Sequence, residues 1–255
     1  MTTVQTFSRE TSIVYRRQLR TNLRNPAWVI IGMVQPMLYL FLFGPLLEPL
    51  SAQIGATNAY TFFVPGILIM QALFGAFFAG FGLINEWREG VIEAERVTPA
   101  NRTALLVGRV LRDLTQLLVQ ALILVGLGYL LGMRAPILGV VLGVTLTLLI
   151  GGACAAASNA FALTVKSEDV MAPVTQMVTM PVFLLSGIFL PMTMGPAWLE
   201  TLANIIPTKH IVDAVRTSFD GTFAASPLLW GTGWSLLLFV LAVWWGTRTF
   251  RKENS

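Results

Sequence analysis

Ionisable side chains gather in one stretch of this chain, residues 85–103 (NEWREGVIEAERVTPANRT). The charged residues of the stretch are Glu86, Arg88, Glu89, Glu93, Glu95, Arg96 and Arg102, whereas residues 27–84 carry a single formal charge, on Glu48. Each of these charges would cost several kcal/mol in hydrocarbon. We therefore expect the stretch to lie in water between two membrane segments, where a soluble partner could bind it.

The familiar catalytic and nucleotide-binding patterns are missing from the sequence. There is no Walker phosphate-binding loop, no HExxH zinc motif and no GxSxG nucleophile motif. His210 is the only histidine and Cys154 the only cysteine, so we expect a surface or interface role for the first and a packing role for the second. We predict no enzyme activity, metal or cofactor in this chain, and any active transport must be driven by another protein.

The composition is that of a membrane protein. Fifty-five per cent of the residues are hydrophobic, 12% are charged and the mean hydropathy is +0.70, which excludes an ordinary soluble domain. The basic residues flank apolar runs rather than clustering with stacking aromatics, so no nucleic-acid partner is predicted. The polar N-terminus precedes a run long enough to span, which argues against a cleavable signal peptide.

Six apolar runs approach the roughly 20 residues that a helix needs to cross a bilayer. They cover residues 27–47, 61–84, 114–132, 136–163, 171–190 and 228–247. We predict an all-α integral membrane fold with six transmembrane helices in one domain, residues 1–255. Small residues are dense between Gly139 and Ala157, which favours close helix packing in a compact bundle.

Residues 1–25 have the pattern of an amphipathic helix. Tyr15, Leu19 and Leu23 recur at helical spacing, and the basic residues of the segment are Arg9, Arg16, Arg17, Arg20 and Arg24. This pattern is typical of a helix lying on an anionic cytoplasmic leaflet. The alternative is a solvated anchor that only fixes the topology. We expect the interfacial helix.

The lysines and arginines indicate the orientation of the bundle. Fourteen of the 17 lie in the N-terminal segment, residues 85–112, the 164–170 turn or the C-terminal tail, which a six-span bundle places on one side. Because cytoplasmic loops carry the excess of basic residues, both termini and residues 85–103 are predicted to be cytoplasmic.

Residues 191–227 form the longest predicted outer connection. Apolar residues recur at helical spacing from Trp198 to Ile206 and again after Pro207. We expect an outer helical hairpin, two short helices that dip into the outer leaflet. The charged residues expected to remain in water are Glu200, Lys209, Asp213 and Arg216.

Two blocks of the sequence resemble a known family, the type-2 ABC exporter permeases. NEWREGVIEAERVTPANRTALLVGRVLRD is similar to the family's cytoplasmic coupling region, and the matching positions are Glu86, Arg88, Gly90, Glu93, Val97, Pro99, Arg102 and Gly108. Ser186–Arg216 (SGIFLPMTMGPAWLETLANIIPTKHIVDAVR) resembles its other hallmark, and the KSEDV turn fits too. The resemblance covers nearly the whole chain and is nearest to the short daunorubicin-resistance and nodulation-export subgroup. Lys209 stands where that family more often has an uncharged residue.

The resemblance implies a permease subunit that works with two copies of a separate ABC ATPase subunit, which would hold ATP and magnesium. A second permease copy, a homodimer in the simplest case, would complete the pathway along the second and fifth spans. The coupling residues it implies are Glu86, Arg88, Glu89, Glu93, Arg96, Pro99 and Arg102. The pathway residues it implies are Phe74, Phe77, Phe78, Met177, Met180 and Phe183.

The function implied is export of a hydrophobic or amphiphilic drug or lipid from the cytoplasm or inner leaflet, across a bacterial or archaeal cytoplasmic membrane. Aromatic and methionine side chains suit such substrates. One alternative is export of a lipid-linked sugar or polysaccharide. Alternatives of other classes are a passive channel or uncoupled carrier and, with less support, a membrane enzyme or scaffold. The sequence leaves the substrate open.

Overall fold

The computed structural model describes residues 3–24, 27–49, 58–96, 101–223 and 226–252. Within these ranges the side chains of residues 3–6, 27–29, 76–77, 94–96, 102 and 251 are not described. The described residues form helices joined by turns, with no strand among them. The elements are α1 Thr3–Arg24, α2 Ala27–Leu47, α3 Ala59–Arg88, α4 Val91–Arg96, α5 Arg102–Leu130, α6 Ile137–Val165, α7 Glu168–Leu185, η1 Met192–Met194, α8 Ala197–Ile205, α9 Pro207–Phe219 and α10 Ser226–Lys252.

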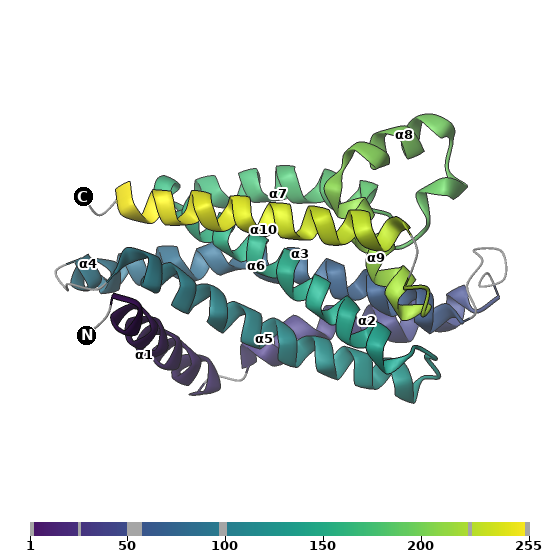
Figure 1. The fold of residues 1–255 in the computed structure, drawn as a ribbon, viewed down its shortest axis with the longest axis horizontal. Coiled ribbons are helices and arrows are strands. Elements are labelled where there is room, and N and C mark those ends of the chain that lie inside the picture. Colours follow the sequence, from purple (N-terminus) through teal and green to yellow (C-terminus); the bar gives the residue numbers. More distant parts are fainter. Residues whose placement is uncertain (1–2, 25–26, 50–57, 97–100, 224–225, 253–255) are drawn as a thin grey trace.

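The long helices run side by side along the length of the molecule (Figure 1). In the described part of the chain, five helices are long and apolar enough to cross a membrane: α2, α3, α5, α6 and α10. The all-helical membrane fold is thus confirmed. The predicted fifth run, residues 171–190, falls on α7, which ends at Leu185 and begins with Glu168 and Asp169. The sixth span therefore stays a prediction.

The two ends of the bundle are formed by different elements (Figure 1). The first turn of α1, the last turn of α10 and the short α4 lie at one end, which we call the α4 end. The helices α8 and α9 lie at the other, the α9 end. Two short helices were expected between residues 191 and 227, and α8 and α9 occupy that range.

Helix α6 occupies the centre and packs against α3, α5, α9 and α10. Its glycines allow this because a methyl group at Gly139 would meet the backbone of Ser218 in α9, and one at Gly152 would lie 2.9 Å from the ring of Phe239 in α10. Backbones that approach this closely form tight helix pairs in lipid. The dense small residues thus act as predicted.

Helix α1 is docked on α5 rather than standing apart from the bundle. A side chain at Gly108 of α5 would lie 2.8 Å from Cγ1 of Val14. The hydroxyl groups of Tyr15 and Thr115 are 3.0 Å apart, and Asn22 donates a hydrogen bond to Gln116 at 3.2 Å. One face of α1 is therefore committed to the protein.

Candidate functional site: a polar cluster and an amphiphilic cavity

A buried ion pair fixes the last turns of α3 to α5. The guanidinium of Arg109 donates to Oε2 of Glu86 through Nη2 at 2.8 Å and Nε at 3.2 Å. The Arg109 side chain is 2% exposed and that of Glu86 is 19% exposed. Gln18 of α1 donates to the other oxygen of Glu86. One carboxylate therefore joins three helices, and the low dielectric around the pair strengthens these contacts.

A second charged pair lies one turn further along α5. Arg112 donates to Asp113 through Nε at 2.9 Å and through Nη2, and its Nη1 donates to Oε1 of Gln18 at 3.2 Å. The Arg112 and Asp113 side chains are 15% and 14% exposed. Gln18 thus bonds to both charged pairs, and we call the set of Gln18, Glu86, Arg109, Arg112 and Asp113 the polar cluster.

The turn after α3 is exposed at the α4 end. Gly90 has a φ of +75°, a conformation that favours glycine, and it redirects the chain into α4. Glu89 and Glu93 are exposed on either side of this glycine. Arg88 forms an ion pair with Glu168 of α7 at 2.9 Å. The turn thus presents acidic side chains to the surroundings while it contacts the start of α7.

The coupling residues expected from the sequence do not all face outward. Glu86 points inward to Arg109, Arg88 reaches α7, and Glu89 and Glu93 are free to meet a partner on the surface. Pro99 lies outside the described residues, and so do the side chains of Arg96 and Arg102.

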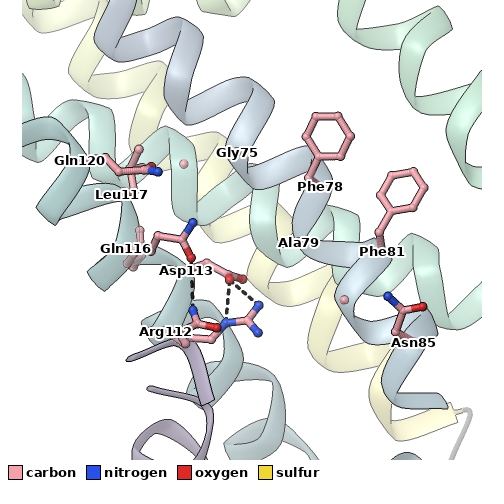
Figure 2. A pocket seen from close by; sticks show the side chains of 14 residues that line it. Gly75, Phe78, Ala79, Phe81, Asn85, Arg112, Asp113, Gln116, Leu117 and Gln120 are labelled. Carbon is pink, nitrogen blue, oxygen red and sulfur yellow. Dashed lines mark hydrogen bonds and ion pairs between the residues drawn. The ribbon is translucent and has the colours of Figure 1, made fainter. Parts of the chain in front are cut away.

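A cavity of about 330 Å³ lies beside the polar cluster, between α3, α5, α6 and the end of α1. Figure 2 shows its lining: Arg112, Asp113 and Gln116 on α5, and Phe78 and Phe81 on α3. The two rings have centroids 5.7 Å apart. Gly151 of α6 also lines the cavity. The lining thus combines amide and charged groups of α5 with aromatic rings of α3, and these rings extend away from the α5 side chains in Figure 2.

Gln120 is a buried polar residue among those that line this cavity. It is 5% exposed, lines the cavity wall, and has no hydrogen-bond partner among the described residues. The carbonyl oxygen of Gln116 accepts a hydrogen bond from Asn22. Its amide NH₂ donates to none of the described residues. Amide groups that line a cavity and lack a protein partner can bond to a ligand or to water that enters it. The cavity is therefore suited to a ligand with both polar and apolar parts.

The pathway residues expected from the sequence fall into different surroundings. Phe78 lines the cavity and is 62% exposed. Phe74 instead packs against Phe183, with ring centroids 5.3 Å apart, in an aromatic group that continues to Phe189. Met177 and Met180 lie on the exposed face of α7. The side chain of Phe77 is outside the described part of the chain.

One expectation about the outer helices is wrong. Arg216 was expected in water, but it is 7% exposed and donates to the carbonyl oxygens of Gly187 and Ile188, each at 2.8 Å. Its guanidinium also lies 3.8 Å from the centre of the Phe62 ring. The sequence signal for this was its place among the apolar residues that α9 buries, Val212 and Val215. A single charged residue within an apolar helical face is as consistent with a buried charge as with a solvent-exposed one.

Neither reactive residue type forms a catalytic arrangement. His210 lies at the α9 end with its Nε2 2.9 Å from the carbonyl oxygen of Asn204, which is a structural contact. Cys154 is half-buried in α6. Among the described residues no three His, Cys, Asp or Glu side chains gather as metal ligands would.

These features define a multi-pass helical membrane protein with a charged turn at one end and a cavity between its long helices. A profile of the ABC-2 type transporter family matches residues 9–219. The chain belongs to this family and is a permease subunit of an ABC transporter.

Named relatives agree with the family. The daunorubicin resistance ABC transporter permease protein DrrB1 of Streptomyces coeruleorubidus is 30% identical over 77% of this chain and 70% of that protein. The ycf38 transport permease of Cyanophora paradoxa is 26% identical over 82% and 74%, and that of Porphyra purpurea 22% over 88% and 75%. The resemblance found in the sequence motifs is confirmed.

Proposed function

We propose that this chain is the membrane subunit of an ATP-driven exporter that moves a hydrophobic or amphiphilic molecule, a drug or a lipid, out of the cytoplasm or inner leaflet. The observation that carries the proposal is the acidic turn at the α4 end. There Glu89 and Glu93 are exposed shortly after Glu86, which forms a buried ion pair with Arg109. A partner that binds this turn contacts the chain directly after the last turn of α3, which Glu86 joins to Arg109 of α5.

The coupling step follows from these connections. Two separate ATPase subunits, which hold ATP and magnesium, would press on the turn around α4. Because the last turns of α3 are bonded to Arg109, force is passed to α3 and α5 together rather than dissipated in a loop. Gly75, Phe78 and Asn85 of α3 line the cavity, so a tilt of α3 changes the shape of the cavity wall. The Arg88–Glu168 contact extends the motion to α7.

The cavity favours an amphiphilic substrate. The Phe78 and Phe81 rings suit an apolar body, and Gln116 and Gln120 suit hydroxyl, carbonyl or amine groups. Because the permease DrrB1 is named for daunorubicin resistance, a drug of mixed polarity is the first substrate to test. An amphiphilic lipid is the second.

The assembly proposed is two permease copies with two ATPase subunits in a bacterial or archaeal cytoplasmic membrane. In it α7 is the sixth span, since 18 residues at about 1.5 Å per residue reach roughly 27 Å, close to the hydrocarbon thickness. Six spans place both termini and α4 on one side, and the basic residues favour the cytoplasmic side.

The test is co-purification of the tagged permease from gentle detergent, followed by ATP-dependent uptake of a fluorescent amphiphilic drug into inverted vesicles. The variant Glu93→Ala with Arg96→Ala removes charge from the turn. We expect it to express normally, keep basal ATPase activity in the complex and lose most ATP-dependent uptake. Glu200→Ala, an acidic residue of α8 at the opposite end, is the matched control.

Two results would overturn the proposal. Normal ATP-dependent uptake by the well-expressed Glu93→Ala and Arg96→Ala variant would remove the turn from the coupling path. Uptake that persists with no ATPase in the preparation and no ATP would instead favour a passive channel or an uncoupled carrier.

A further inference from the structure

The outward face of α1 is strongly basic. A surface groove of about 540 Å³ follows this face, lined by Ile13, Arg16, Arg17, Arg20, Thr21 and Arg24. Arg16, Arg20 and Arg24 are exposed and follow one another at four-residue spacing, so their side chains lie along one face of the helix. The face contains no carboxylate among its lining residues.

The opposite face of the same helix is fully engaged with the bundle. Val14 packs against Gly108, Tyr15 contacts Thr115, and Gln18 bonds to the polar cluster. The acidic residue of α1, Glu10, accepts from the backbone N–H of Asn101 at 2.8 Å. The docked position of α1 therefore leaves the arginine row without a carboxylate from its own helix.

Such a row is unfavourable without an external anion. Like charges at four-residue spacing destabilise a helix, and here they are held in fixed register by the docking of the other face. Among the described residues no carboxylate pairs with Arg16, Arg20 or Arg24, and a local rule broken without such compensation indicates a functional site. Guanidinium groups match phosphate oxygens with paired hydrogen bonds, so the missing partner is a phosphate.

The surroundings of the row identify the source of that phosphate. Exposed apolar side chains flank it, with Ile13 59% exposed and Leu23 71% exposed. Helix α2 begins shortly after Arg24, and its spanning portion starts at Ile30. Charges on one side and apolar surface on the other, next to the first residue of a span, are the conditions under which arginine stems lie along lipid with their heads at the phosphates.

We propose that Arg16, Arg20 and Arg24 form a binding site for the phosphate headgroup of an anionic phospholipid, and that its occupancy holds α1 in its docked position on α5. The lipid thereby stabilises the contacts of Gln18 with the polar cluster from the outside. The arginine row lines a different groove from the amphiphilic cavity, and lipid binding there can be tested on the permease alone.

The experiment measures thermal unfolding of the full-length permease in a neutral detergent during titration with phosphatidylglycerol or phosphatidylcholine. We expect phosphatidylglycerol to raise the unfolding temperature by several degrees and phosphatidylcholine to have little effect. Each arginine is worth about five-fold in affinity for an anionic surface. The triple variant Arg16→Gln, Arg20→Gln, Arg24→Gln is therefore expected to bind phosphatidylglycerol on the order of 100-fold more weakly.

Controls separate this site from a general charge effect. Arg134→Gln, at an exposed position between α5 and α6, is compared with Arg20→Gln and should keep the full lipid response. The variant Arg16→Lys, Arg20→Lys, Arg24→Lys should keep most of the lipid response. This variant also provides a folded comparison if the triple glutamine variant is unstable. Equal stabilisation by both lipids, or an undiminished response in the triple glutamine variant, would overturn the proposal. So would an equal response to inorganic phosphate alone, because the occupant would then be a free anion.

Discussion

The two ends of the bundle each bury an arginine, and they hold its charge in different ways. At the α4 end Arg109 is 2% exposed and faces the carboxylate of Glu86. At the α9 end Arg216 is 7% exposed and faces backbone carbonyl oxygens and the ring of Phe62. The first contact is between side chains of two helices, and the second is between a side chain and backbone carbonyl oxygens.

Arg216 remains a cation despite its surroundings. Burial lowers the pKa of Arg216 to about 10, with Asp213 and Asp220 acting in the opposite direction. The guanidinium is therefore charged at neutral pH, and its hydrogen bonds to carbonyl oxygens replace those of water. It joins α9 to the turn after α7 and to α3, which makes this end a fixed frame.

The comparison suggests that the two ends of the bundle have different mechanical roles. Contacts at the α4 end run between side chains of α1, α3, α5 and α7, and an ion pair can be exchanged for another when helices move. Contacts at the α9 end depend on carbonyl oxygens and on glycines that admit neighbouring backbone. In the proposed exporter the α4 end would be the movable end and the α9 end the fixed one, and each buried arginine is a probe of one end.

The largest expected effect follows from removal of the carboxylate at the α4 end. Glu86→Gln removes the carboxylate to which the buried guanidinium of Arg109 donates, and breaking a buried ion pair costs roughly 3–5 kcal/mol. Because Glu86 is 19% exposed, we expect the lower end, about 3 kcal/mol. Denaturant unfolding in detergent measures it, and Asp169→Asn, an exposed acid of α7, is the control. A loss indistinguishable from that control would contradict the buried-pair interpretation.

At the α9 end, Arg216→Met is expected to lower the free energy of unfolding by about 2 kcal/mol, because the carbonyl oxygens of Gly187 and Ile188 lose their donor. The loss is smaller than for Glu86→Gln because the substitution also removes the cost of burying a charge. The free energy of unfolding of Arg216→Lys should lie between those of wild type and Arg216→Met, since an ammonium group reaches fewer carbonyl oxygens than a guanidinium. A wild-type-like Met variant would show that the anchor adds no stability.

The same substitution has a defined pH dependence. The folded state releases the proton of Arg216 near pH 10, at a lower pH than the unfolded chain does. The unfolded state binds more protons only above about pH 10, so stability from this group rises only there. The difference between wild type and Arg216→Met should therefore be constant from about pH 6 to about pH 9. A difference that changes in this range would assign the effect to another group.

Sequence patterns predicted the long helices because a span needs only length and low charge. Five of the six predicted ranges fall on helices able to cross a membrane. The sequence was less informative about residues 85–103, since α3 continues through Arg88 and α5 begins at Arg102. Charge alone marks where water is reached, not whether a helix ends there.

The pairing of charges was the part that sequence could not supply. Glu86 and Arg109 are separated by 23 positions, and Gln18 lies 68 positions from Glu86. Nothing local specifies that they meet. For the same reason the burial of Arg216 was not predicted. Its partners are backbone carbonyl groups, which every residue carries and which the sequence therefore does not mark. Which charges face water is a property of the packed bundle.

The rigidity of the α9 end is tested more finely by glycine substitution. A methyl group at Gly139 would meet the backbone of Ser218, and backbone cannot yield as a flexible side chain does. Gly139→Ala should cost about 1–3 kcal/mol from overpacking. At Gly126 of α5 nothing lies within 4 Å of an added Cβ, so Gly126→Ala should be neutral or slightly stabilising. Equal thermal stability of the two variants would show that α6 and α9 separate easily.

The smallest expected effect on stability belongs to the exposed ion pair of Arg88 and Glu168, whose side chains are 53% and 34% exposed. A double-mutant cycle with alanine at each position should give a coupling of about 0.5 kcal/mol or less. At about 1 M salt it should vanish, because the screening length falls to roughly 3 Å. If the pair transmits motion between α3 and α7, the same alanine variants will show a clear loss of ATP-dependent uptake while their free energy of unfolding hardly changes. A coupling of several kcal/mol would instead make this contact structural, and the α4 end as fixed as the α9 end.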